Sequence, residues 1–176
     1  REQIILSSFL HHFPIETQKR IQQGKIQLEE HIIIVRHKVT AGNGNRQILL
    51  GNNSESKVVP GVKNIEGNEL GDFENMVVTK VRIAHATHAS ETNPAALIYK
   101  NGGNTVPAIV RNSKLDVRIN ENRKFETELC MYFNYEGQYA AVPGYFDCQV
   151  LKAPFVIPEK QPIEIGYTDP EGLTLP

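Results

Sequence analysis

The chain has 176 residues, of which 40% are hydrophobic and 22% are charged, so it is long and apolar enough to fold around its own core. Nineteen basic and twenty acidic side chains leave a net charge of −1, which excludes a general electrostatic attraction to nucleic acid or to an anionic membrane. Two cysteines, Cys130 and Cys148, are too few for a disulfide-rich scaffold or a four-cysteine zinc module.

Residues 1–24 are predicted to form a helical arm. Four apolar side chains recur at the spacing of one helix face: Leu6, Phe9, Leu10 and Phe13. Pro14 interrupts this stretch, and a second helical stretch over 15–23 ends at Gly24, a residue type common just after helices. The arm packs either on its own domain or on a neighbouring subunit, because terminal segments are disordered unless something holds them. The chain begins at Arg1 and not at methionine, so we expect a start that was trimmed, processed or left out.

After Gly24 the apolar residues alternate with polar ones, which predicts a β body over 25–151. Turn sequences rich in Asn and Gly separate the strands, a pattern typical of an antiparallel sandwich or barrel. Strands are expected at 26–39, 47–50, 77–83, 97–99, 106–110, 114–119, 125–134, 138–142, 145–151 and 163–167. The predicted fold class is therefore mainly β, an antiparallel β-sandwich with a short helical N-terminal arm.

Two regions depart from this alternation. Residues 51–72 are rich in Asn, Gly, Ser and Glu and are predicted to form a long surface loop with a short strand at Val58 and Val59. Loops of this length are uncommon in compact domains and are often functional. Residues 152–176 are rich in proline, which is excluded from central strands. We expect an edge strand there and an extended segment that includes the last core strand.

The best metal-binding candidates are His85 and His88, with Glu91 close by, because imidazole and carboxylate groups bind several divalent ions. On a strand that continues through 88, the two imidazoles point to opposite faces, and only a turn at 86–87 would bring them together. We therefore expect a strand end that runs into a polar loop, with no metal site and no cofactor.

Candidate catalytic groups are also sparse. Glu126 and Glu128 share one strand face and could form a glycosidase-like carboxyl pair, but alternating Glu is common on the solvent side of a sheet. No Gly-x-Ser-x-Gly motif occurs, and neither cysteine has a histidine near it in sequence. Gly42-Asn43-Gly44 is only half of a dinucleotide-binding motif and fits a turn better. We expect no enzymatic activity; a cupin-like or other β-barrel enzyme is the remaining enzymatic alternative.

Four segments resemble parts of viral jelly-roll capsid proteins. Residues 114–120 and 125–133 resemble strands of that architecture. Residues 155–165 are similar to the closing segment of several bacteriophage capsid and capsid-associated proteins, in which a Pro-flanked turn precedes the final core strand. Residues 20–26 are similar to the passage from helix to strand in phage structural proteins.

The resemblance implies a jelly-roll virion structural protein, which serves as a capsid shell, vertex or decoration subunit. Its location would be the virion, its partners would be further copies of itself and other capsid proteins, and the family has no catalytic residues to transfer. Assembly through terminal arms would place subunit contacts at Leu6, Phe9, Leu10, Phe13, Phe155, Ile157 and Pro158. We expect no sequence-specific nucleic-acid partner, and no membrane span because no apolar run approaches about 20 residues.

A ligand- or glycan-binding β-sandwich module is the main alternative. Four tyrosines around one predicted hairpin could form an aromatic surface: Tyr132, Tyr135, Tyr139 and Tyr145. The absence of tryptophan and the aromatic content of only 7% argue against a sugar-binding platform. A monomer that binds glycan would favour this alternative, whereas a closed oligomer would favour the virion protein.

Overall fold

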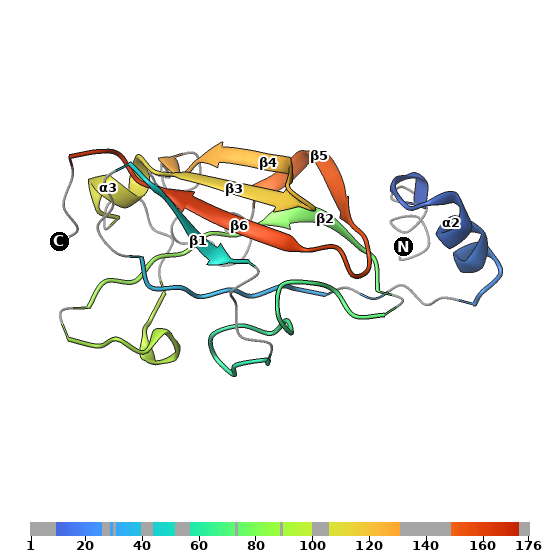
Figure 1. Ribbon diagram of the computed structural model, residues 1–176, viewed down its shortest axis with the longest axis horizontal. Coiled ribbons are helices and arrows are strands. Elements are labelled where there is room, and N and C mark those ends of the chain that lie inside the picture. The colour runs from blue at the N-terminus through green and yellow to red at the C-terminus, as the bar shows by residue number, and fades with distance from the viewer. Residues whose placement is uncertain are drawn as a thin grey trace, which may run out of the picture.

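The computed structural model describes residues 10–25, 29, 31–39, 44–51, 57–72, 74–88, 90–99, 106–130 and 149–172. They form a mainly β protein with antiparallel sheets and few helices (Figure 1). The strands are β1 (Arg46–Leu50), β2 (Met76–Val81), β3 (Lys114–Ile119), β4 (Asn122–Glu128), β5 (Gln149–Ile157) and β6 (Ile163–Thr168). The helical turns are η1 (Leu10–His12), α2 (Ile15–Gln22), η2 (Pro94–Ala96) and α3 (Ala108–Arg111).

The strands form two antiparallel sheets. A four-stranded sheet has the order β1-β6-β3-β4, and a two-stranded sheet pairs β2 with β5. Strand β6, the last in chain order, therefore lies between β1 and β3. The register places Ile165 of β6 opposite Val117 of β3, and Val117 opposite Phe125 of β4.

Alternation along the strands gives the two sheets a common core. On β3, Leu115, Val117 and Ile119 are buried, and the side chain of Arg118 between them lies on the opposite face. The main core cluster takes side chains from both sheets and from the 57–72 region: Leu50, Ile65, Leu70, Val117, Ile119, Ile157 and Ile163. Removal of these apolar side chains from water is the main force that holds the sheets together.

Strand β5 can accommodate Pro154 because the pairing of β5 with β2 is interrupted by a bulge. Val78 pairs with Phe155 and Lys80 pairs with Val150, so residues 151–154 face a single residue of β2. Pro154 lies in this insertion, where its missing N–H removes no ladder hydrogen bond. The proline-rich segment can therefore supply one strand of the two-stranded sheet.

The structure differs from the sequence prediction in three segments. Residues 108–111, which overlap the strand expected at 106–110, form α3 after Pro107, whose carbonyl accepts a hydrogen bond from the Arg111 N–H at 3.0 Å. A proline cannot donate to a sheet ladder but suits a helix start, which explains the difference. Residues 97–99 follow η2 and form no strand. In the described part of the strand expected at 26–39, which is residue 29 and residues 31–39, the only bridge is the isolated Val35–Lys63 pair.

Asn64 explains how the segment 31–39 attaches without a full strand beside it. Its Oδ1 accepts a hydrogen bond from the Ile34 N–H at 2.6 Å, and its Nδ2 donates to the Ile32 carbonyl at 2.5 Å. One side-chain amide thus provides the donor and the acceptor that a neighbouring strand would supply. Nearby, Arg36 donates to the Gly61 carbonyl at 2.7 Å and lies 4.9 Å from the centre of the Tyr99 ring.

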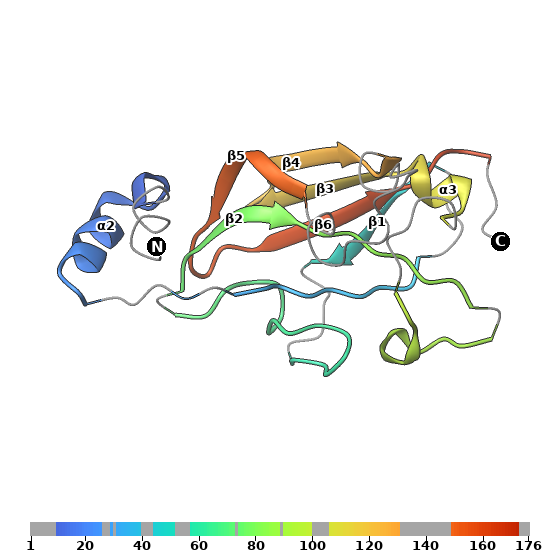
Figure 2. The same cartoon turned by 180° about the vertical axis from the view of Figure 1, so that it is seen from behind.

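The N-terminal arm lies at the end of the sheets, beside the turn between β5 and β6 (Figures 1 and 2). Its two helical pieces, η1 and α2, flank Pro14 as expected, and Gly24 follows α2 with a φ of +67°, a left-handed conformation that suits glycine. Leu6, Phe9 and the strand expected at 138–142 lie outside the described residues. So do residues 131–134 of the strand expected at 125–134 and residues 145–148 of the strand expected at 145–151. In the part of the chain that the structure describes, no helix has the length and apolar character to cross a membrane.

Candidate functional site

A pocket at the arm end of the sheets is bordered by the hairpin between β3 and β4. Asn120 and Glu121, the two turn residues, have φ values of 49° and 65°, the backbone conformation of a two-residue type I′ hairpin. The Asn120 N–H donates to the Pro162 carbonyl at 2.9 Å, and Asn122 Nδ2 donates to the Asn120 carbonyl at 3.1 Å. The first bond fixes the hairpin tip to the residue just before β6, and the second lies within the tip itself.

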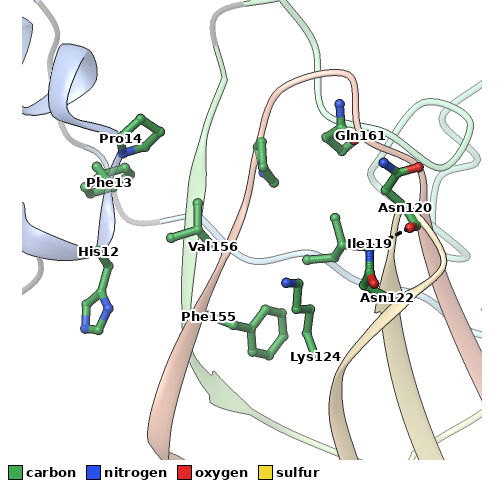
Figure 3. Close-up of a pocket in the computed structure, with 11 residues that line it drawn as sticks. His12, Phe13, Pro14, Ile119, Asn120, Asn122, Lys124, Phe155, Val156 and Gln161 are labelled. Carbon is green, nitrogen blue, oxygen red and sulfur yellow. Dashed lines mark hydrogen bonds between the residues drawn. The ribbon is translucent and has the colours of Figure 1, made fainter.

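A bulge in β4 brings Lys124 to this pocket. Val117 pairs with Phe125 and Arg118 pairs with Arg123, so Lys124 is the extra residue of β4. A bulge breaks the regular alternation of side chains and redirects the extra residue. Figure 3 shows Lys124 directed into the space bordered by Ile119 and Phe155.

The pocket has a volume of about 700 Å³, within the range of ligand and side-chain binding sites. Its lining residues are His12, Phe13, Pro14, Ile119, Asn120, Asn122, Lys124, Phe155, Val156, Pro158 and Gln161. The walls are largely apolar, and the Phe155 ring stacks on the ring of Phe125, with ring centres 6.5 Å apart. Among the residues that the structure describes, no acidic side chain lines the pocket and no ion pair involves Lys124. The site thus joins an apolar surface with one positive charge.

The N-terminal arm forms one wall of the pocket. Phe13 is buried, with 8% of its surface exposed, and the carbonyl of Phe13 accepts a hydrogen bond from Gln18 Nε2 of α2 at 2.8 Å. Of the residues predicted for subunit contacts, Phe13, Phe155 and Pro158 line this pocket. Leu10 is half-buried on η1, and Ile157 belongs to the main core. Their role in contacts between subunits stays a prediction.

Sequence reasoning did not find Lys124, Asn120 or Gln161. Their position depends on the β4 bulge and on contacts between segments that are far apart in the chain, and the sequence pattern shows neither. The apolar residues of the arm and of 155–158 were the only part of this site with a sequence signal.

A second charged site lies on the opposite face of the four-stranded sheet. Arg46 of β1 donates two hydrogen bonds of 2.8 Å to the Asp116 carboxylate of β3 and also pairs with Glu164 of β6. Arg118 donates to Asp116 at 3.0 Å. To reach β3 from β1, the Arg46 guanidinium crosses β6 at Gly166 and occupies the space where a Cβ atom would lie. Any residue larger than glycine at position 166 would displace the guanidinium.

The charges in this cluster shift each other's titration. Burial tends to raise the pKa of Asp116, but the hydrogen bonds and charges of Arg46 and Arg118 outweigh burial and lower its pKa below the ordinary value. The hydrogen bond to Asp116 raises the pKa of Arg46 in turn, with partial burial opposing it. The cluster is internally satisfied and joins three strands of one sheet.

The polar residues singled out from the sequence have structural contacts. His88 Nδ1 accepts hydrogen bonds from the N–H groups of Ser90 and Glu91, at 3.3 and 2.9 Å, and thereby closes a local turn. Glu126 pairs with Arg123, and Glu128 accepts a weak hydrogen bond from the Cys130 thiol at 3.8 Å. Among the described residues, no group of three or more His, Cys, Asp or Glu side chains could hold a metal ion. The four tyrosines and Cys148 lie outside those residues.

Comparisons with protein-family models, with curated proteins and with solved structures find no match for this chain.

Proposed function

We propose that the protein is a structural, non-enzymatic subunit of a virion, a jelly-roll β-sandwich that assembles with copies of itself and with other capsid proteins through its N-terminal arm. The antiparallel mainly β body and the resemblance of residues 114–120, 125–133 and 155–165 to phage capsid proteins support the virion assignment. The observation that carries the assembly role is the state of helix α2.

Helix α2 has eight residues and none of them is buried. Isolated helices shorter than about 12–15 residues are marginal in water, and most helices in proteins are stabilised by packing an apolar face on their surroundings. The first residue of α2, Ile15, keeps 71% of its surface exposed. A short helix with an exposed isoleucine is therefore better explained by contact with a partner than by contact within its own chain.

The mass of the full chain in solution, compared with that of a variant lacking residues 1–24, tests this function. Deletion of the arm leaves all six described strands in place, whereas a deletion from 152 onward would remove β6 and most of β5. We expect the full chain to form a closed oligomer by light scattering coupled to size exclusion. The arm deletion should be a monomer whose far-ultraviolet circular dichroism keeps the β-sheet signal and loses only the helical contribution of η1 and α2. The same number of subunits in both proteins at every concentration would overturn the proposal. If both are monomers, binding of the full chain to a glycan array would favour a glycan-binding module.

A further inference from the structure

An exposed apolar side chain and an apolar pocket lie next to each other at the arm end of the molecule. Ile15 directly follows Pro14, which lines the pocket, and it stands 71% exposed at the start of α2. The pocket beside it, at about 700 Å³, is large enough to receive an isoleucine side chain and part of its helix. The same end of the molecule therefore carries both a protruding group and an open pocket.

The charges on the two features are complementary. Glu16, next to Ile15, is the acidic residue in the first turn of α2, and its contact with Lys19 at 3.6 Å is an exposed pair that is easily exchanged. Lys124 faces the pocket, has no ion pair within the described ranges, and is surrounded by lining residues that carry no negative charge. A helix that placed an apolar residue in the pocket would thus find a cation for the carboxylate that follows.

We propose that the occupant of the pocket is helix α2 of a second copy of this chain, in a two-fold symmetric dimer. Each Ile15 enters the pocket of the other copy, and each Glu16 pairs with Lys124 of the other copy. Because the helix and the pocket are adjacent on one copy, a single two-fold axis brings both into contact at once, as a self-complementary interface requires. The same contact covers the exposed side of α2. This inference rests on the proposed function and names the surface through which the arm acts.

The first test is the variant Ile15→Asp, measured by sedimentation over a range of concentrations. Aspartate is favourable in the first turn of a helix, so the variant should keep α2. We expect the dimer dissociation constant to rise about 100-fold, since two isoleucines per dimer lose their site and each contributes about a factor of ten. The matched control is Ile98→Asp, a change at an isoleucine that is 82% exposed and lies outside the arm and the pocket, which should leave the dissociation constant unchanged.

The second test exchanges the charges. Glu16→Lys and Lys124→Glu should each weaken the dimer, because each places like charges together at both contacts. An equimolar mixture of the two variants should form a heterodimer of normal affinity, because both contacts then pair opposite charges. A mixture that stays monomeric where the unaltered chain is a dimer would overturn the inference.

The outcomes separate the inference from the function on which it rests. If the arm deletion is monomeric while Ile15→Asp and both charge variants assemble normally, the arm mediates assembly through another surface and only this inference fails. If the arm deletion assembles like the full chain, the proposed function itself fails.

Discussion

Two of the cations on the four-stranded sheet have contrasting surroundings, Arg46 on the face opposite the main core and Lys124 at the end of the sheet. Arg46 is held by Asp116 and Glu164 and lies flat across Gly166, so its charge is used within the chain. Lys124 projects from a bulge beside an apolar pocket and has no ion pair among the described residues. The comparison separates a charge that stabilises the fold from one that is available to a partner.

The largest effect should come from Gly166→Ala. The added methyl group lies where the Arg46 guanidinium is, so the arginine must leave Asp116, whose side chain is only 12% exposed. We expect the free energy of unfolding in urea to fall by about 2–3 kcal/mol, because a largely buried carboxylate loses its partner. In the control Gly71→Ala the new methyl group meets only the end of the Glu74 side chain, and the loss should stay within about 0.5 kcal/mol. Equal losses in both variants would show that Arg46 stabilises little.

The ion-pair cluster around Asp116 should also make the free energy of unfolding depend on pH, with a smaller effect than that of Gly166→Ala. The pKa of Asp116 is lowered in the folded state, so its contribution is complete above the ordinary titration range of aspartate and is lost as the pH falls through the folded-state pKa. Between about pH 6 and about pH 3, the unaltered protein should lose more unfolding free energy than Asp116→Asn does, by at most about 1 kcal/mol. Asp72→Asn, which changes a 62% exposed carboxylate, should follow the unaltered protein. A parallel pH profile for Asp116→Asn would contradict this account.

The smallest effect on stability is expected for Lys124→Gln. This variant tests directly whether Lys124 and Arg46 have different roles. The free energy of unfolding should change by less than about 0.5 kcal/mol, because Lys124 is exposed and stabilises no described contact. Association of the chain should nevertheless weaken. Arg46→Gln should do the reverse, with an unfolding free energy lowered by about 2 kcal/mol and no direct effect on association. A large loss of stability in Lys124→Gln would place this lysine in the fold and not at an interface.

The sequence predicts those elements whose side chains alternate over the whole length of a strand. Strands β1, β3 and β6 lie within one residue of their expected bounds. Strand β2 begins one residue before its expected start and ends two residues before its expected end. In these strands the apolar residues alternate with polar ones, which is the pattern on which the prediction rests. Residues 106–110 have the same β-branched composition, but Pro107 starts a helix there. Local composition does not distinguish a strand from a helix at 106–110, since the choice depends on the missing N–H group of Pro107.

The candidate pocket was only partly predictable. The apolar residues of the arm and the segment 155–158 were expected to take part in contacts, and the structure places Phe13, Phe155 and Pro158 in one pocket. The cation of that pocket depends on a bulge that moves one side chain out of alternation, and a bulge has no reliable sequence signal. The role of Gly166 was hidden for a similar reason, because a strand glycine shows nothing of the arginine that crosses it.

The position of β6 has a consequence for how the chain folds during synthesis. Both β1 and β3 pair with a strand that the ribosome makes after every other described strand, and the ion pair between Arg46 and Glu164 joins residues 118 positions apart. The four-stranded sheet therefore cannot close until residue 168 has emerged, and until then β1 has no described partner to cover its edge. Such long-range pairing is slow compared with local structure, so the newly made chain passes through a stage in which its strand edges are open to association, a natural point for chaperone binding.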